Sequence, residues 1–313
     1  MMDFDKNWWA VIVGGSSGFG LAAAKKLAAC KINVCIVHRD RRSAMKKIEP
    51  EFDTLRKTGV GVVTFNLDGL SEEGRTRVLD GLSEELGKTG KVRLLLHSVA
   101  FGNLKLLGPY PGSEAPAAAR ARIAGDAGLP KDRIDEIVNS AFADGLNALY
   151  TMVDDAGDYS NRQFLGSEDF SRTLHAMGYN IVEWVQDILD RDLFAEDARV
   201  LSLTSEGNSV AWKGYAAISA AKAVLESVTR AMAVEFASRG LRANVIQAGI
   251  TDTPALQAIP GNARIRAQAA LRNPFGRLTT PEDVANVICL LCTDEASWIN
   301  GAIICADGGE RVG

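Results

Sequence analysis

Short apolar segments recur along the chain, and helix-length amphipathic segments lie between them. Seven of the apolar segments have the length of a strand, namely residues 9–13, 33–37, 61–65, 92–97, 200–203, 243–247 and 302–306. This alternation predicts an α/β fold in which helices cover both faces of one parallel sheet. Right-handed crossovers make it a doubly wound, seven-stranded sheet, which binds its ligand at the carboxyl ends of the strands.

One long segment, residues 103–169, lacks any strand pattern and is called the insertion below. A helical pattern over residues 132–152 places six apolar side chains on one face: Ile134, Ile137, Val138, Phe142, Leu146 and Leu149. We expect residues 1–313 to form a single domain, with the insertion leaving the sheet after the fourth strand. It would act as a wall or lid of the substrate pocket, or alternatively as an oligomer contact.

Composition narrows the possible partners. The 313 residues are 47% hydrophobic and 24% charged, and the net charge of −4 is spread along the chain. The absence of a basic region argues against nucleic acid or an anionic membrane as a partner. No segment approaches the roughly 18 apolar residues of a membrane span, and residues 1–7 lack the apolar core of a signal peptide, so we expect a cytoplasmic protein.

The five cysteines, Cys30, Cys35, Cys289, Cys292 and Cys305, all lie in apolar segments. This placement predicts reduced and buried thiols. Cys289 and Cys292 form a C-x-x-C motif without a second pair or a nearby histidine, so we expect no bound metal.

A glycine-rich turn lies directly between the first strand and the first helix. It contains Gly14, Gly18 and Gly20, and Ser16, Ser17 and Phe19 lie among them. Glycines permit a tight turn and let a pyrophosphate approach backbone amides at the positive end of the helix. The turn therefore predicts a dinucleotide site.

The second predicted strand ends in a cluster of basic residues, His38, Arg39, Arg41 and Arg42. An NAD-binding protein normally has a carboxylate at this point, whereas positive charge would pair with the 2′-phosphate of NADP. We therefore favour NADPH over NAD as the cofactor. The alternative is that the arginines form the solvated start of the next helix, and Asp40 beside them leaves that alternative open.

Tyr215 and Lys222 are seven residues apart in a long amphipathic segment. On a helix this spacing is about two turns, so both side chains would project from one face. A phenol near an ammonium can hydrogen-bond and protonate an oxygen that becomes negative during hydride transfer. We expect the lysine charge to make the tyrosine more acidic.

These motifs resemble those of the short-chain dehydrogenases/reductases, which have a Rossmann fold, over nearly the whole chain outside the insertion. Most ketone-reducing members have the tyrosine four residues before the lysine, where this chain has Ile218. The longer Y-x6-K spacing and the segment LLLHSVAFG resemble the enoyl-acyl-carrier-protein reductase branch instead. The resemblance implies an NADPH-dependent reductase of fatty acid metabolism, acting on the C=C bond of an enoyl thioester of carrier protein or CoA.

Two positions depart from that pattern. Val13 stands where the family usually has a threonine, and Ser205 stands where many enoyl reductases have a second tyrosine. Ser205 also aligns with the substrate-binding serine of ketoreductases, so a carbonyl reductase using Ser205, Tyr215 and Lys222 stays open as an alternative. A third hypothesis is a protein that binds the cofactor without catalysis.

The resemblance also implies roles for residues outside the motifs. Asn180 would support a proton-relay water, although a plain helix-surface residue is an equal alternative, and Lys222 would hold the nicotinamide ribose. The residues implied to line the cofactor site are Leu67, Asp68, Ser98, Ala100, Gly249, Ile250 and Thr253. The C-terminal segment would pack subunits into a homotetramer or homodimer. We interpret His97 as structural rather than catalytic and assign no role to His175.

Overall fold

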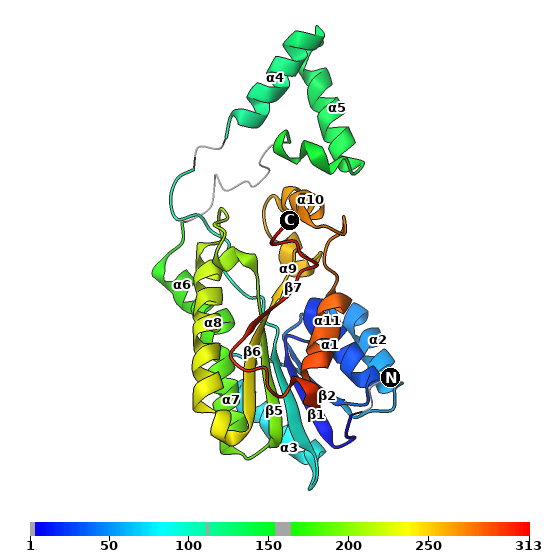
Figure 1. The fold of residues 1–313 in the computed structure, drawn as a ribbon, viewed down its shortest axis with the longest axis vertical. Coiled ribbons are helices and arrows are strands. Elements are labelled where there is room, and N and C mark those ends of the chain that lie inside the picture. The colour runs from blue at the N-terminus through cyan, green and yellow to red at the C-terminus, as the bar shows by residue number, and fades with distance from the viewer. Residues whose placement is uncertain (1–3, 111–112, 154–163) are drawn as a thin grey trace.

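The computed structural model describes residues 4–110, 113–153 and 164–313. In these residues one sheet has the parallel order β3-β2-β1-β4-β5-β6-β7 (Figure 1). The strands are β1 (Trp8–Val13), β2 (Asn33–His38), β3 (Val62–Asn66), β4 (Lys91–His97), β5 (Phe194–Thr204), β6 (Leu241–Ala248) and β7 (Ile303–Ala306). The predicted doubly wound, seven-stranded sheet is thus confirmed.

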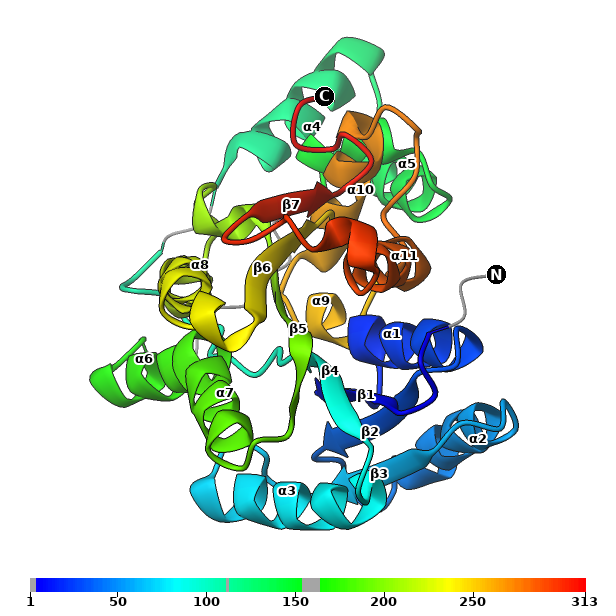
Figure 2. The ribbon, with the colours of Figure 1, turned by 60° about the horizontal axis from the view of Figure 1, so that its bottom comes forward.

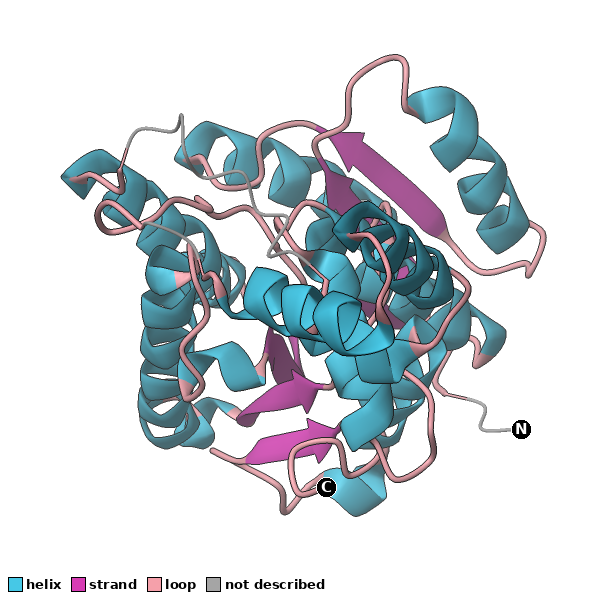
Figure 3. Ribbon diagram, turned by 90° about the horizontal axis from the view of Figure 1, so that it is seen from above, coloured by secondary structure: helices cyan, strands magenta, loops and turns pink. Residues whose placement is uncertain are grey.

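Helices cover both faces of the sheet (Figures 2 and 3). One face carries α1 (Gly18–Ala29), α2 (Met45–Arg56) and α11 (Pro281–Leu291), and the other carries α3 (Glu72–Leu86), α7 (Asn180–Asp190) and α8 (Ala216–Glu235). Because side chains alternate along a strand, Ala10 and Ile12 of β1 pack into the first layer and Val11 and Val13 into the second. Both faces are therefore apolar, which explains the nearly continuous apolar runs in the sequence.

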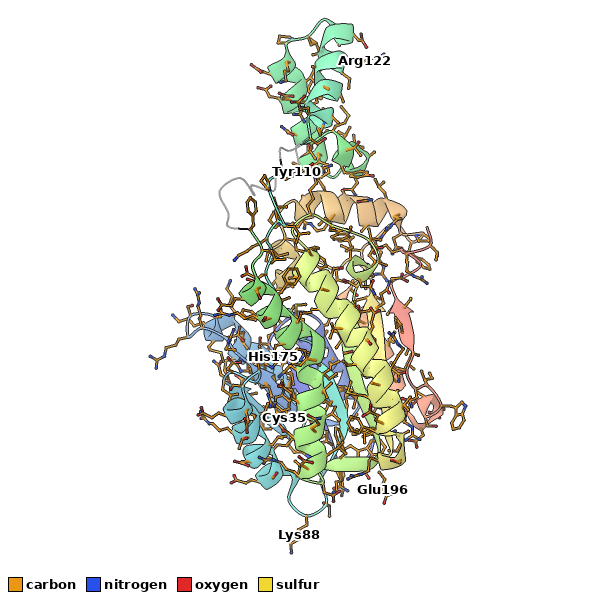
Figure 4. The ribbon with its side chains drawn as sticks, turned by 90° about the vertical axis from the view of Figure 1, so that its left-hand side faces the viewer. Cys35, Lys88, Tyr110, Arg122, His175 and Glu196 are labelled. Atoms are coloured by element: carbon orange, nitrogen blue, oxygen red, sulfur yellow. The ribbon has the colours of Figure 1, made fainter. Side chains whose placement is uncertain are left out.

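The insertion forms a helical hairpin that projects beyond the sheet and its helices (Figure 1). It consists of α4 (Ala115–Ala127) and α5 (Lys131–Ala143), followed by the 3-10 helix η1 (Asn147–Thr151), which packs on α10 (Asn262–Arg272). Figure 4 shows Arg122 of the hairpin at one end of the molecule and Lys88 at the other. The hairpin has a small core of its own, made by Ala124, Ile134, Val138 and Val153.

The single helix predicted over residues 132–152 was wrong. The helix ends at Ala143, and Gly145 adopts a left-handed conformation with φ of +97° that favours glycine and breaks the helical path. Two of its predicted face residues, Ile137 and Leu146, are exposed. The part of the predicted insertion at residues 111–112 and 154–163 lies outside the described residues.

Among the described residues, no helix combines the length and hydrophobicity that a membrane crossing requires. All five cysteines are free thiols, and Cys30, Cys35, Cys289 and Cys292 are buried as predicted. The prediction for Cys305 was wrong, because this residue is exposed on β7, the strand at the edge of the sheet.

Candidate active site

The glycine-rich turn is packed so closely at Gly14 and Gly20 that neither position has room for a side chain. A Cβ added at Gly14 would lie 2.5 Å from the Ser98 backbone oxygen, and one at Gly20 would lie 2.2 Å from the oxygen of Gly14. Ser17 precedes α1, and its side chain does not cap the helix, so backbone amides of the first turn stay available. A compact turn with open amides at a helix N-terminus fits the pyrophosphate of a dinucleotide.

A cavity of about 440 Å³ lies at the carboxyl ends of β1, β2 and β4. It is lined by most of the residues predicted to contact the cofactor: Gly14, Ser16, Ser17, Gly18, Phe19, His38, Arg39, Leu67, Asp68, Ser98, Ala100 and Thr253. Gly20 does not line it, since its backbone packs against Gly14 instead.

Of the four basic residues predicted to face the cofactor, His38 and Arg39 line the cavity, and of these two Arg39 is the exposed one. Arg39 donates from Nη1 to Asp68 Oδ2 at 2.8 Å, and its guanidinium lies 4.9 Å from the ring centroid of Phe101. His38 is buried, with Nδ1 2.8 Å from Asp40 Oδ2. Arg41 and Arg42 are exposed and do not line the cavity, so the structure does not support the prediction that all four residues present charge to it.

A second cavity of about 220 Å³ adjoins the first, since Ser98, Ala100 and Thr253 line both. It brings together the predicted catalytic residues Tyr215, Lys222 and Ser205 with Gly249 and Ile250 of the loop after β6. The Thr253 hydroxyl accepts from the Leu256 amide, which caps the short helix α9 (Pro254–Gln257).

Tyr215 lies just before α8, not within it. It is the N-cap residue, with φ −105° and ψ 2°, whereas Lys222 lies in the second turn. The prediction that both residues belong to one helix was therefore wrong, although both reach the same cavity. Gly207, which the sequence did not single out, packs on the phenol, and a Cβ there would lie 2.5 Å from the Tyr215 ring.

Burial is the largest cause of the pKa shifts of Lys222 and Tyr215. Lys222 is buried and donates from Nζ to the Leu203 oxygen at 2.7 Å; burial lowers its pKa to about 8, and the Glu226 charge opposes this. Burial also raises the pKa of Tyr215, and the Ser205 hydroxyl acts against that shift. The expectation of a more acidic tyrosine was thus wrong, because desolvation of the phenolate outweighs the neighbouring groups.

Ser205 Oγ is buried close to the Tyr215 phenol, and hydrogen bonding between the two hydroxyls acts to lower the pKa of the tyrosine. It lines the second cavity together with Tyr215. A hydroxyl has one donor and two acceptor sites, so Ser205 can also hydrogen-bond a molecule bound in this cavity.

Asn180 lines neither of these two cavities and is fully buried, so the alternative of a plain helix-surface residue was wrong. It begins α7, directly after one π-helical turn over His175–Tyr179 that the sequence did not predict. Its Nδ2 donates to Glu183 Oε2 at 2.8 Å, and His175 Nε2 lies 3.1 Å from the same carboxylate. Asn180 Oδ1 and His97 Nε2 are both buried, and hydrogen bonding to the Asn180 side chain acts to raise the pKa of His97.

His97 is buried at the end of β4. Burial lowers its pKa to about 3, and the Lys222 charge acts in the same direction. The imidazole is therefore neutral at physiological pH, in keeping with a structural residue.

Sequence comparison gives relatives that reduce or oxidise different bonds. The chain is 39% identical over 115 residues to Cis-4-hydroxycyclohexanecarboxylate dehydrogenase of Sinomonas cyclohexanicum, which covers 37% of this chain and 45% of that protein. It is 26% identical over 302 residues to a probable 2,4-dienoyl-CoA reductase of Bacillus subtilis, which covers 96% of this chain and 95% of the relative.

Solved structures share the fold at low identity. An enoyl-(acyl-carrier-protein) reductase from Anaplasma phagocytophilum in complex with NAD has a TM-score of 0.69 at 18% identity, covering 100% of this chain and 96% of that one. A short chain dehydrogenase from Burkholderia cenocepacia in complex with NADP also has a TM-score of 0.69, at 19% identity and 98% coverage of both chains.

The family model described as Enoyl-(Acyl carrier protein) reductase matches residues 126–310, more than half of the chain. This match includes Ser205, Tyr215, Lys222 and the loop after β6. The protein therefore belongs to this enoyl-(acyl carrier protein) reductase-like family of short-chain dehydrogenases/reductases and is an oxidoreductase.

Proposed function

We propose that the protein is an NADPH-dependent reductase of enoyl thioesters. The observation that carries the proposal is the place of Tyr215, seven residues before Lys222, at the N-cap of α8 and in the same cavity as the lysine. An enoyl thioester accepts hydride at a carbon two bonds away from its carbonyl carbon. Tyr215 lies about one helical turn before Ile218, the position of the tyrosine in ketone-reducing members. This position suits a substrate oxygen that is farther from the hydride donor.

When bound, NADPH supplies the hydride that reduces the β-carbon. Tyr215 would donate a hydrogen bond to the thioester oxygen, which becomes negative as the C=C bond is reduced, and would deliver the proton that completes the reaction. Its raised pKa keeps the phenol protonated at neutral pH, as a hydrogen-bond donor must be. Lys222, with a pKa of about 8, is mostly cationic at neutral pH and would hold the ribose of the cofactor.

The preference for NADPH is supported by Arg39, because it lines the larger cavity at the end of β2. Its partner Asp68 is half-exposed, so the ion pair can open and let the guanidinium meet a 2′-phosphate. The structural relatives described above bind either NAD or NADP, and a nicotinamide cofactor fits both.

The insertion is proposed as a wall of the substrate site. A third cavity of about 240 Å³ is bounded by Tyr150 of η1 and shares Trp212 and Ile259 with the second cavity. A substrate longer than the second cavity would therefore pass beside the insertion. A contact with another subunit stays the alternative, in line with the proposed homotetramer or homodimer.

One observation favours a second candidate, a carbonyl reductase. The Ser205 hydroxyl, which lines the same cavity as Tyr215, is suited to hold a ketone oxygen. A screen of NADPH and NADH consumption with crotonyl-CoA, crotonyl carrier protein and a panel of ketones separates the two. We expect turnover of the thioesters with NADPH; turnover of ketones alone would favour the carbonyl reductase.

A further inference from the structure

Arg272 joins segments that reach the second cavity from distant parts of the chain. It is the last residue of α10, and its Nη2 donates to Glu206 Oε1 at 2.6 Å and to Glu310 Oε1 at 3.0 Å. Glu206 is 8% exposed and Glu310 is 2% exposed. Carboxylates this deeply buried are costly to leave unpaired, so the single guanidinium between them fixes their positions.

Glu206 connects Arg272 to the segment that precedes Tyr215. It follows Ser205 directly and lines the second cavity with it. Its backbone oxygen accepts from Ser209 Oγ at 3.0 Å and from the Val210 amide at 2.8 Å, which closes the turn at Glu206–Asn208. Gly207 in the middle of this turn packs on the ring of Tyr215, so a shift of the Glu206 side chain reaches the phenol.

Glu310 connects Arg272 to the loop after β6. Its Oε2 accepts from the Ile250 amide at 3.0 Å, and it packs so closely that a Cβ on Gly249 would lie 2.8 Å from it. Ile250 and Thr253 of this loop line the cavities, so one carboxylate links the guanidinium to the loop backbone.

The guanidinium is suited to this bridge. Arg272 holds two carboxylates at once, and its planar group keeps a charge at every physiological pH. Burial raises the pKa of Glu310, while the bonds from Ile250 and Arg272 oppose that shift. Without Arg272 the two carboxylates would face one another inside the protein and repel.

We propose that Arg272 is a positioning residue, which bridges Glu206 and Glu310 and thereby holds the Ser205 turn and the loop after β6 at a fixed separation around the reacting groups. This inference rests on the proposed function only in that the cavities take NADPH and a substrate. It holds whether the enzyme reduces the C=C bond of an enoyl thioester or the C=O bond of a ketone.

The test compares three full-length variants. Arg272→Leu removes the bridge, Arg272→Lys keeps a cation at the same place, and Arg277→Leu is the matched control, because Arg277 pairs with Asp283 on the surface and touches neither loop. Each protein is measured for the Kd of NADPH by nucleotide fluorescence, for kcat and KM with crotonyl-CoA, and for its urea unfolding midpoint.

We expect Arg272→Leu to raise the Kd of NADPH about fivefold and to lower kcat about tenfold or more. Arg272→Lys should recover most of the loss, and Arg277→Leu should stay within about twofold of the wild type. A purely structural arginine would lower the midpoint while the folded protein kept its Kd and kcat, and that result would overturn the proposal.

Arg272→Leu could fail to fold, so a milder variant accompanies it. Glu310→Gln keeps the size of the side chain and an oxygen for the Ile250 amide but loses the charge that Arg272 pairs with. We expect the Kd of NADPH to rise about threefold; an unchanged Kd would contradict the bridge. A wild type that binds NADPH but reduces no thioester or ketone would reject the proposed function, while the Kd series would still decide the role of Arg272.

Discussion

The sheet with its covering helices and the insertion hairpin differ in how each is held together. The sheet places two apolar clusters against its faces, and residues such as Ile12 and Ile188 are fully buried there. The hairpin buries only a few side chains between α4 and α5 and touches the rest of the molecule mainly where η1 meets α10. The proposed chemistry lies in the first region, and Tyr150 of η1, next to the hairpin, lines a cavity that adjoins the proposed site.

The difference teaches where stability and specificity reside. A side chain in the sheet region contributes to a core shared by many elements, whereas one in the hairpin stabilises a local unit. Changes in the first region should therefore alter catalysis or global stability, and changes in the second should alter which substrates bind. The predictions below test this division.

The largest effect is expected from a single oxygen in the sheet region. Tyr215→Phe removes the proposed proton donor and should lower kcat by about a factor of 10²–10⁴ with the fold intact. The matched change in the insertion, Tyr150→Phe, should alter kcat by no more than about threefold, because Tyr150 lines the third cavity and not the first or second. Steady-state kinetics on both variants measure kcat. Equal losses of kcat would contradict the proposed division between the sheet region and the hairpin.

A matched pair of core substitutions tests the two cores. Ile188→Ala opens a hole in the core behind the sheet and should cost about 2–5 kcal/mol of global stability. Ile134→Ala makes the same change in the hairpin core and should lower the global stability by less than about 1 kcal/mol, because the hairpin can loosen locally. Urea denaturation followed by tryptophan fluorescence measures both. Similar losses would mean that the hairpin folds as one cooperative unit with the sheet.

The success of the sequence analysis follows the same division. Buried parallel strands are continuous runs of β-branched and aliphatic residues, so all seven were predicted within a few residues except the longer start of β5. In the insertion, the apolar period continues from α5 into η1, although α5 ends at Ala143 and Gly145 just beyond it is left-handed. The hydrophobic period of a sequence does not reveal the end of a helix when apolar residues continue at the same spacing beyond that end.

Within the candidate site, local motifs were predicted and long-range contacts were not. The glycine turn and the Tyr215 and Lys222 pair are set by spacing along the chain. Arg272 meets Glu206 and Glu310 across 66 and 38 residues, and such pairings depend on tertiary packing. The direction of the Tyr215 pKa likewise depends on burial, which a list of neighbours in sequence does not contain.

The buried charge of Lys222 should lower the stability of the folded protein, and this loss can be measured. Its pKa is about 8 in the folded protein against an ordinary 10.5, so between these values the unfolded chain binds more protons and stability rises with pH. Lys222→Met removes the buried charge, and although it leaves the Leu203 oxygen without its donor, the variant should be about 1–2 kcal/mol more stable at pH 7. Denaturation at pH 7 and pH 10.5 should show this advantage shrinking; a constant difference would contradict the lowered pKa.

Cofactor preference gives a smaller effect, also within the sheet region. Arg39→Ala should raise the Kd of NADPH about tenfold and leave the Kd of NADH within about twofold, because only NADPH carries the 2′-phosphate. The control is Arg41→Ala, which removes an exposed arginine outside the cavity. Fluorescence titration with both nucleotides separates the variants. An equal rise in the Kd of NADPH and of NADH would contradict a specific contact between Arg39 and the 2′-phosphate.

The smallest effect on the chemistry is expected from the largest change in the chain. Removing residues 111–160 deletes the hairpin and the wall at Tyr150 while leaving Tyr215, Lys222 and the sheet in place. Because the proton donor and the cofactor site are intact, kcat with crotonyl-CoA should stay within about threefold, while KM for longer acyl chains rises severalfold or the range of accepted substrates widens. Light scattering on the same protein tests the alternative role: unchanged kinetics together with a smaller oligomer would assign the hairpin to subunit contact, because opening the third cavity would then make no difference to how substrates bind.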